Sequence, residues 1–354
     1  MNKTLFNISV KFEFGAKQRV KFYAKLAQLL ENGVALDTAL MQIQKTSGRA
    51  KGSVLPILFG RWRRAVANGM NFGKVLAPYI PSSEAILIET GADSGRLVDA
   101  IRNALQSVEQ QGKVKKAIIT SSAYPFVLVL MLIGALVLCS FMVIPTFEQI
   151  IPLDQWEGVP YTVAVASGFI REKGLFILLA LITVIIAVSM SMPRWAGKTR
   201  IPFDNVIPYN FYRMWQGSAF LLSVSSMMAA GVKLDEVSLG RLARQGDPYL
   251  RIRVRAVQKW MSSGLNFGDA LAQAGYNFPD PELIADLQIY ANLKGFDKNI
   301  TKITNDWVEE LIETVKTAMQ IVNFIVLMMI AVVIGLLITA FFGIFQQINS
   351  STNV

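Results

Sequence analysis

Residues 69–77 read GMNFGKVLA and residues 264–272 read GLNFGDALA, so one short motif occurs twice, 195 residues apart. Other pairs keep nearly the same separation. NGVALDTAL at 32–40 matches AGVKLDEVS at 230–238, IPTFEQI at 144–150 matches GIFQQI at 343–348, and a weaker pair begins at 91 and 290. A separation that stays constant over most of a chain indicates duplication of a whole structural unit.

Each copy of the repeat has the pattern of a helical bundle. Apolar residues recur at helical spacing over 20–34, and glycines stand where helices should end. An asparagine two residues after the glycine of GMNFG or GLNFG can cap the next helix. Short links between such helices predict antiparallel hairpins. The predicted helix-closing residues are Gly33, Gly69, Gly231 and Gly264, and the predicted caps are Asn71 and Asn266.

Residues 1–16 have a different pattern. Ile8, Val10, Phe12 and Phe14 alternate with other residues, which is typical of an extended chain. We therefore expect an N-terminal extended tail over 1–16. Such a tail would dock on the sheet edge of a partner or be disordered, and the pattern does not choose between these.

Three uncharged apolar stretches are long enough to cross a bilayer, at 123–145, 174–192 and 318–345. The whole chain is 53% hydrophobic and only 17% charged, which agrees with a membrane protein. The third stretch would form about 42 Å of helix, so we expect it to tilt or to project from the membrane.

Charge predicts the orientation of these spans. Residues 1–122 hold 18 Lys and Arg against 8 Asp and Glu, and basic residues also follow the second span. Basic flanks favour the cytoplasm, and the first 30 residues lack the apolar core of a signal peptide. We therefore expect cytoplasmic domains at 17–122 and 193–317, an external (periplasmic) loop at 146–173, and an external tail at 346–354. The second span, which has no counterpart in the repeat, would return the chain to the cytoplasm.

The composition excludes several kinds of chemistry. The chain has no histidine and one cysteine, Cys139, so it cannot build a Ser-His-Asp triad, a Cys-His pair or an internal disulfide. It has no P-loop motif, so the energy for any work must come from a partner. Uncharged spans argue against a proton relay. We expect no cofactor and, despite the basic RWRR at 61–64, no nucleic acid.

Two polar features remain as candidate sites. ETGADSGRL at 89–97 joins two predicted helices, and its Glu89 and Asp93 would bind a cation or a partner's arginine, or form a solvated turn that caps the next helix. Whether a metal binds there stays open. Gln320 and Asn323, one turn apart in the third span, would hydrogen-bond to a neighbouring helix or lie near the headgroups.

The ordered motifs resemble a known family. Both copies carry G-V-x-L-D and G-x-x-F-G, and the first copy continues through ETGADSGRL, Tyr124-Pro125 at the start of a span and IPTFEQI at its end. Over roughly residues 17–349 this set resembles the type II secretion system F family, the inner-membrane platform proteins of type IV pilus and type II secretion machines. The short linkers and divergent second repeat are more similar to the platforms of type IVb or conjugative thin pili.

The resemblance implies an all-α membrane protein with two cytoplasmic helical bundles, three transmembrane helices and no catalytic activity. It also implies four kinds of partner: a hexameric motor ATPase, pilin subunits, other inner-membrane assembly proteins, and further copies of the same chain. The residues that we expect to face the motor are Arg61, Arg63, Arg64, Glu89, Asp93 and Arg96.

Two other classes compete with this interpretation. A permease subunit driven by a separate ATPase would also lack a P-loop, but we would expect more spans and facing polar residues in the membrane. A membrane enzyme would need clustered carboxylates at the membrane face. Asp154 and Glu157 lie in the external loop, in a Pro- and Gly-rich stretch typical of a turn.

Overall fold

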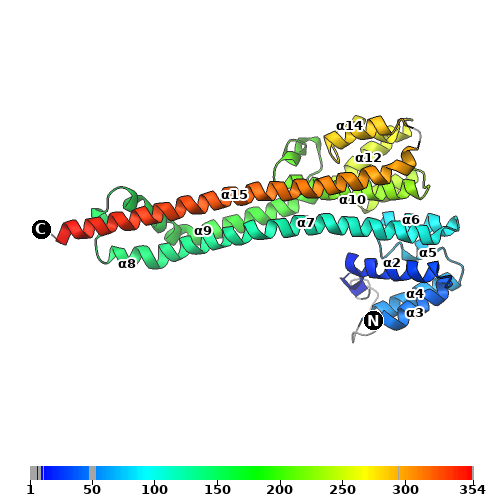
Figure 1. Cartoon of the computed structure of the whole chain (residues 1–354), viewed down its shortest axis with the longest axis horizontal. Helices are drawn as coiled ribbons and strands as arrows, with labels where there is room; N and C mark the ends of the chain where they lie inside the picture. Colours follow the sequence, from blue (N-terminus) through cyan, green and yellow to red (C-terminus); the bar gives the residue numbers. More distant parts are fainter. Residues whose placement is uncertain (1–5, 7–8, 11, 48–52, 294, 353–354) are drawn as a thin grey trace. The chain divides into compact units, whose positions relative to one another are not determined.

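The computed structural model describes residues 6, 9–10, 12–47, 53–293 and 295–352. Within these residues all regular structure is helical, which confirms the predicted all-α class. The chain forms two compact units. The first contains Met1–Lys116 and Met192–Ile312, and the second contains Ala117–Ser191 and Glu313–Val354. Figure 1 traces the helices of both units along the chain.

The first unit holds two copies of one helix order. The first copy runs through α2 (Ala16–Glu31), α3 (Leu36–Ser47), α4 (Leu55–Ala67), α5 (Phe72–Leu76) and α6 (Ser82–Asp93) into α7 (Leu97–Leu138). The second runs through α10 (Tyr209–Ala229), α11 (Glu236–Gln245), α12 (Pro248–Ser262), α13 (Phe267–Ala274) and α14 (Pro281–Tyr290) into α15 (Phe296–Thr352). In both copies the short helices pack as hairpins, α3 on α4 and α5 on α6, then α11 on α12 and α13 on α14.

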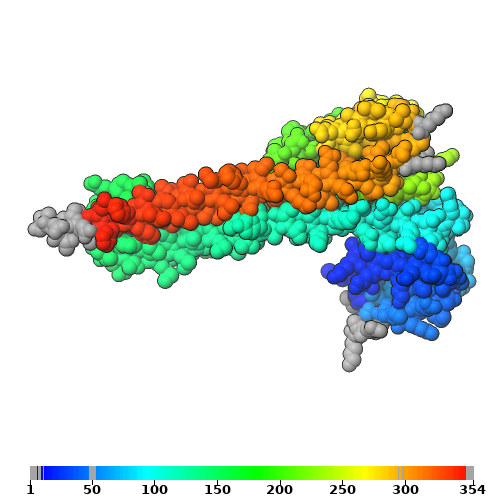
Figure 2. All heavy atoms as spheres, in the orientation of Figure 1, coloured from blue at the N-terminus to red at the C-terminus, as the bar shows by residue number. Residues whose placement is uncertain are grey.

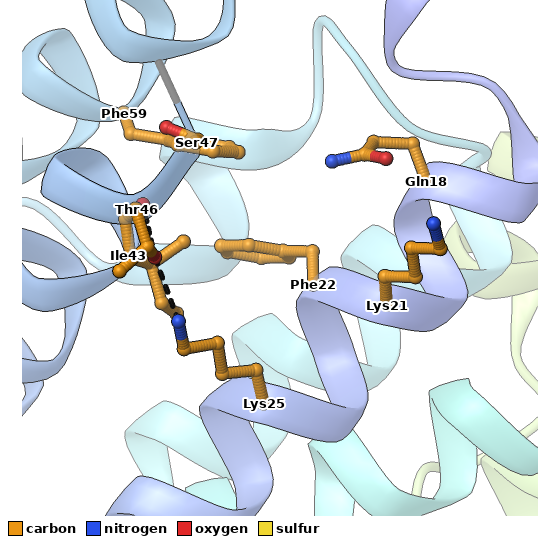
Figure 3. Close-up of a pocket in the computed structure, with 8 residues that line it drawn as sticks. All are labelled: Gln18, Lys21, Phe22, Lys25, Ile43, Thr46, Ser47 and Phe59. Atoms are coloured by element: carbon orange, nitrogen blue, oxygen red, sulfur yellow. Dashed lines mark hydrogen bonds between the residues drawn. The ribbon is translucent and has the colours of Figure 1, made fainter. Parts of the chain in front are cut away.

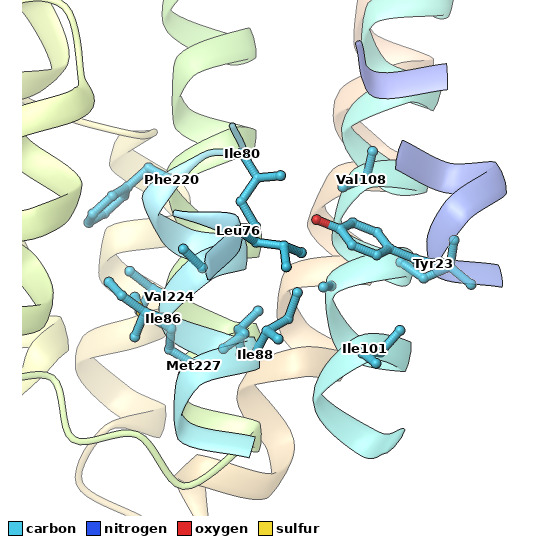
Figure 4. Close-up of a cluster of buried hydrophobic side chains, with 14 of the residues drawn as sticks. Tyr23, Leu76, Ile80, Ile86, Ile88, Ile101, Val108, Phe220, Val224 and Met227 are labelled. Atoms are coloured by element: carbon cyan, nitrogen blue, oxygen red, sulfur yellow. The ribbon is translucent and has the colours of Figure 1, made fainter. Parts of the chain in front are cut away.

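The two copies share one hydrophobic core. Helix α6 of the first copy packs against α10 and α11 of the second. Figure 4 shows Ile86 of α6 beside Val224 and Met227 of α10, while Ile88 points toward α7 on the other side of α6. All four side chains are buried. Helix α6 is therefore a central element that has apolar residues on two faces.

The N-terminal segment differs from the extended tail predicted over 1–16. Its described residues 6, 9–10 and 12–13 are helical. Phe6, Val10 and Phe14, spaced four residues apart, are buried, whereas Phe12 is 85% exposed. Phe14 packs edge-on against the ring of Trp62, with 5.2 Å between ring centroids. The spacing of four places three apolar side chains on one face of a helix, and their burial outweighs the alternating pattern.

The second unit contains the apolar helices. The part of α7 in this unit leads into a π-helical turn (Cys139–Val143) and α8 (Ile144–Glu148), and α9 (Val159–Arg194) follows. Helices α7 and α15 lie side by side here (Figures 1 and 2). Three stretches, Leu97–Glu148, Val159–Arg194 and Asn299–Gln347, are long and apolar enough to cross a membrane, and they contain the three predicted spans.

The connection predicted as a loop over 146–173 is partly helical, since α9 already begins at Val159. The connection between α8 and α9 packs into a small hydrophobic core. Trp156 donates from Nε1 to the carbonyl of Ile151 at 3.0 Å, and both residues are buried with Ile344 of α15. The apolar side chains in the middle of the spans are mostly exposed, as expected for helices that face hydrocarbon.

Candidate functional site

The duplicated Asn-Phe-Gly sequence forms a corner between two helices in the first copy. Gly69 ends the preceding helix with a φ of 79°, and the side chain of Asn71 accepts hydrogen bonds from the backbone N–H groups of Gly73 and Lys74. The amide nitrogen of Asn71 donates to the carbonyl of Glu89 at 3.0 Å and to Oδ1 of Asp93 at 2.6 Å. Asn71 therefore caps α5 and also ties it to the end of α6.

The second copy builds the same corner. Gly264 has a φ of 92°, and Asn266 caps α13 by accepting from the N–H of Asp269 at 2.9 Å. Its amide nitrogen donates to Oδ1 of Asn292 at 3.0 Å, just beyond α14. Asn292 thus takes the place of Asp93, and Gln288, which donates to Asp269 at 3.1 Å, takes the place of Glu89. The repeated motif encodes a helix corner, with different charges in each copy.

The last glycine of each motif allows two helices to touch. A Cβ atom added to Gly73 would lie 2.2 Å from the backbone nitrogen of Glu89. One added to Gly268 would lie 2.3 Å from the carbonyl oxygen of Leu287. Both distances are far below van der Waals contact, so no larger residue fits without moving the next helix. Gly33 and Gly231 follow the C-cap residues of α2 and α10, and their φ angles are 78° and 76°.

The predicted loop at 89–97 is instead mostly helical. Glu89 to Asp93 form the last turns of α6, and only Ser94 to Arg96 separate it from α7. An added Cβ on Gly91 would lie 2.2 Å from Cβ of Ala100, so this glycine lets α6 and α7 pack closely. The glycines therefore allow a tight turn between two closely packed helices.

Glu89 connects the two copies of the repeat. Its Oε2 accepts from Nη1 of Arg241 on α11 at 2.9 Å, and its Oε1 lies 3.8 Å from Nζ of Lys74. The Glu89 side chain is 16% exposed. Asp93 and Arg96, by contrast, are exposed. Arg241 was not among the predicted residues, because nothing in its local sequence marks it as the partner of a residue 152 positions away.

The three arginines at 61, 63 and 64 lie along α4. The guanidinium of Arg61 stacks on the ring of Phe6, 4.1 Å from its centroid. Arg63 lies 3.5 Å from the carboxylate of Asp37, and Arg64 donates from Nε to the carbonyl of Gly60. Arg61 and Arg64 are exposed. These arginines lie on a different helix from the Glu89 turn.

Two buried ionic clusters were not predicted from the sequence. In the first copy, Glu84 accepts from Nε of Arg19 at 2.9 Å and from the hydroxyl of Tyr23 at 2.7 Å. Burial raises the pKa of the Glu84 carboxyl, although Arg19 and Tyr23 oppose that shift. The hydroxyl pKa of Tyr23 is also raised, by burial and then by the charge of Glu84. A glutamate within SSEAILIE is the one local signal for this cluster.

In the second copy, Asp204 accepts from Arg200 at 2.9 Å and from Arg253 at 2.8 Å. The ring of Tyr249 contacts both guanidinium groups, and its centroid lies 4.0 Å from Cζ of Arg200 and 3.4 Å from Cζ of Arg253. All these side chains are buried, and burial lowers the pKa of Arg253. The i,i+4 spacing of Arg200 and Asp204 is a weak sequence signal. This cluster fixes the chain between the end of α9 and the start of α10.

The polar pair of the third span lies in the second unit. Gln320 is exposed, and Asn323 is half-buried. The Oδ1 atom of Asn323 is buried and has no hydrogen-bond partner in the part of the chain that the structure describes. Among the described residues no group of three or more Asp, Glu or Cys side chains could hold a metal ion.

Comparisons with known proteins agree with this architecture. The family model described as "Type II secretion system (T2SS), protein F" matches residues 22–145 and 220–344, so its two copies start 198 residues apart. The chain is also similar to the "Toxin coregulated pilus biosynthesis protein E" of Vibrio cholerae serotype O1 (strain ATCC 39315 / El Tor Inaba N16961). The two are 23% identical over 339 residues, which cover 95% of this chain and 98% of that protein.

These matches confirm the duplication predicted from the repeated motifs. Together with the three apolar helices, they show a multi-pass inner-membrane protein. The family model covers both repeats and well over half of the residues. The chain therefore belongs to the type II secretion system protein F family.

Proposed function

We propose that this protein is the inner-membrane platform of a type IV pilus machine or a related type II secretion machine. The observation that carries the proposal is the family match to both repeats, supported by near-complete coverage of a relative named for pilus biosynthesis. In this role the platform has no catalytic activity of its own. It couples a cytoplasmic hexameric motor ATPase to the extraction of pilins from the membrane and their assembly into a fibre.

The proposed orientation puts both repeats in the cytoplasm and the C-terminus in the periplasm. The support is the excess of Lys and Arg in residues 1–122 and the basic residues after the second span. The three apolar helices would then meet the apolar helices of pilins and of other inner-membrane assembly proteins. Self-association, as a dimer or higher oligomer, is part of the same proposal.

The motor would contact exposed charges on the first repeat. Among the six candidate residues, Arg61, Arg64, Asp93 and Arg96 are exposed. Glu89, in contrast, is largely covered and paired with Arg241. In this proposal Glu89 positions the helix end that carries Asp93, while the exposed residues make the contact.

Purification of the tagged protein in mild detergent, with mass spectrometry of what accompanies it, tests the proposed role. A hexameric secretion-type ATPase together with pilin-like subunits is the expected result. A nucleotide-binding-cassette ATPase with a solute-binding protein would overturn it and favour the permease alternative.

Charge reversal tests the motor-facing surface. Arg64→Glu and Arg96→Glu should each reduce recovery of the motor and the number of fibres, because both side chains are exposed. Arg255→Glu, on an exposed face of α12 in the second repeat, is the matched control and should leave both unchanged. Equal losses in all three variants, or none, would place the motor contact elsewhere.

A further inference from the structure

The contact between the two repeats uses a different face of each one. The first repeat contributes α6 and the turn before it, residues 77–81. The second repeat contributes α10 and the end of α11. The two surfaces border a groove of 730 Å³, and the backbone N–H of Ser82 donates to Gln245 there. Because the repeats are homologous, each should also carry the face that the other one uses.

The first repeat carries a corresponding groove, which none of the residues that the structure describes fills. A groove of 370 Å³ lies between α2, α3 and α4 (Figure 3). The offset of 198 residues maps five of its lining residues onto second-repeat residues that line the 730 Å³ groove between the repeats. The matching pairs are Gln18 and Gln216, Lys21 and Ala219, Phe22 and Phe220, Lys25 and Ser223, and Ser47 and Gln245.

The second repeat carries the inserting face, and it is open too. The paired corners align α6 with α14 at an offset of 199 residues, since Asn71 reaches Asp93 where Asn266 reaches Asn292. Ile86 and Thr90, on the covered face of α6, therefore correspond to Ala285 and Ile289. Ile289 is 64% exposed. Ile289, which replaces Thr90, is therefore an apolar side chain exposed on the surface of the unit.

The two open faces have opposite charge. Lys21 and Lys25 line the groove on α2, in the places of Ala219 and Ser223, and none of its described lining residues is acidic. The exposed face of α14 carries Glu282 and Asp286. Within the chain, the contact uses the Glu89–Arg241 ion pair, whose equivalents Gln288 and Ile43 are uncharged, and a hydrogen bond donated to Gln245 by the backbone N–H of Ser82. Its equivalent Pro281 has no N–H to donate, so ion pairs would replace that hydrogen bond.

We propose that α14 and its preceding turn in one copy of this chain dock into the α2–α3 groove of a second copy. This contact corresponds to the part of the internal contact made by the turn before α6, because Leu26, the equivalent of Val224, is already buried within the first repeat. It is head-to-tail, so it generates a ring or an open array rather than a two-fold dimer. Each repeat leads directly into its own apolar helix, α7 or α15. The inference rests on the proposed self-association and not on the motor or pilin contacts.

Disulfide cross-linking of two full-length copies in native membranes tests this interface. Both copies carry Cys139→Ala, and they differ in tag. One copy carries Lys21→Cys and the other carries Glu282→Cys. Oxidation should give the mixed dimer, and neither variant should form a dimer with itself. Ser82→Cys with Gln245→Cys in one chain is the control, because these positions are in contact and should close a disulfide within the monomer.

The outcomes separate the interface from self-association in general. A dimer of Lys21→Cys with itself would show that copies meet through identical faces, which overturns the head-to-tail contact and leaves self-association standing. If neither the mixed dimer nor the Lys21→Cys dimer forms while the control disulfide closes, the head-to-tail contact is also overturned. If native electrophoresis then shows a monomer, self-association is overturned as well. A cross-link from Lys21→Cys to the motor ATPase would show that the groove has a different occupant.

Exchange of the charges at Lys21 and Glu282 gives a second test. Restoration of the dimer by the second substitution would show that the first variant is folded. In this test the dimer is joined by a disulfide between Ser47→Cys in one copy and Pro281→Cys in the other. Adding Lys21→Glu should lower its yield by about fivefold, which is the upper limit for the effect of one exposed ion pair. Glu282→Lys in the other copy should restore that yield. Failure of the restoration would exclude pairing of these two residues.

Discussion

Gly73→Ala is the sharpest test of the helix corner. Its added Cβ would lie 2.2 Å from the backbone nitrogen of Glu89, 2.4 Å from its Cα and 2.6 Å from its Cβ. Two of these three atoms are backbone, so they cannot be avoided by a side-chain rotation. The start of α5 and the end of α6 would have to separate by about 1 Å or more to restore ordinary carbon contacts.

The expected cost follows from overpacking. Forcing one methyl group into a close-packed contact costs about 1–3 kcal/mol, and the better helix propensity of alanine returns up to about 1 kcal/mol. We expect the upper part of that range, a net loss of about 2 kcal/mol, because the clash is with backbone. For a unit of this size that loss lowers Tm by about 4–8 °C.

Thermal unfolding of the detergent-solubilised protein, followed by intrinsic tryptophan fluorescence, measures this shift. Gly112→Ala is the matched control. Gly112 lies within α7, and an added Cβ there meets no atom within 4 Å, so Tm should stay the same or rise. Gly268→Ala should behave like Gly73→Ala. If Gly73→Ala and Gly112→Ala melt at the same temperature, the close contact between α5 and α6 is not as described.

Three further predictions concern the ionic contacts. Asp204→Asn leaves two buried guanidinium groups without a counter-charge and should destabilise the protein by about 3–5 kcal/mol in chemical unfolding. Asp247 is half-buried and caps α12 by accepting from the N–H of Leu250, which an asparagine can also do, so Asp247→Asn should cost much less. Arg241→Ala removes an ion pair whose arginine is 46% exposed, so its Tm should change by no more than the equivalent of about 1 kcal/mol; a larger loss would show that the pair holds the two repeats together. Burial raises the pKa of Glu84, so this carboxyl binds a proton more tightly in the folded state than in the unfolded state. The free energy of unfolding, compared with that of Glu84→Gln, should therefore fall as the pH rises from the ordinary glutamate pKa through the raised one. A difference in Tm between these two proteins that is flat with pH, or that increases with pH, would contradict the raised pKa.

The helix corners could be predicted from the sequence because their signals are local. A glycine with positive φ and an asparagine cap act within a few residues, so GMNFG and GLNFG indicate where one helix ends and the next begins. The three spans were equally predictable, since length and lack of charge decide them. The closeness of Gly73 to Glu89 was not predictable, because it depends on how α5 and α6 pack.

The errors in prediction have a common physical cause. At residues 6–14 the alternating pattern and the spacing of four coexist, and only the neighbouring Phe22 and Trp62 decide which one is used. At Glu89 a glycine-rich sequence suggested a loop, but tight packing against Ala100 explains the glycine at 91. The partner of Glu89, Arg241, belongs to the other repeat. Tertiary contacts of this kind leave no periodic signal in a single sequence.

The comparison of the two corners bears on how any partner can use the repeats. The backbone of the corner is the same in both copies, but Lys74, Glu89 and Asp93 in the first copy are replaced by Asp269, Gln288 and Asn292 in the second. In the first copy the corner is charged and is partly covered through Glu89 and Arg241. In the second it has lost two of these charges and reversed the third, and Asn292 is exposed.

A partner that bound both corners in the same way would meet a lysine at position 74 of one and an aspartate at the equivalent position 269 of the other, and one of these contacts would be unfavourable. The duplication therefore supplies one scaffold with two different surfaces. A hexameric motor that contacted both repeats of one chain would have to do so through different residues on its subunits. Lys74→Asp and Asp269→Lys give each corner the charge of the other one. If the motor uses different residues for the two repeats, these two variants should change motor binding by different amounts. Interchangeable effects would show instead that the partner reads the shared backbone of the corner.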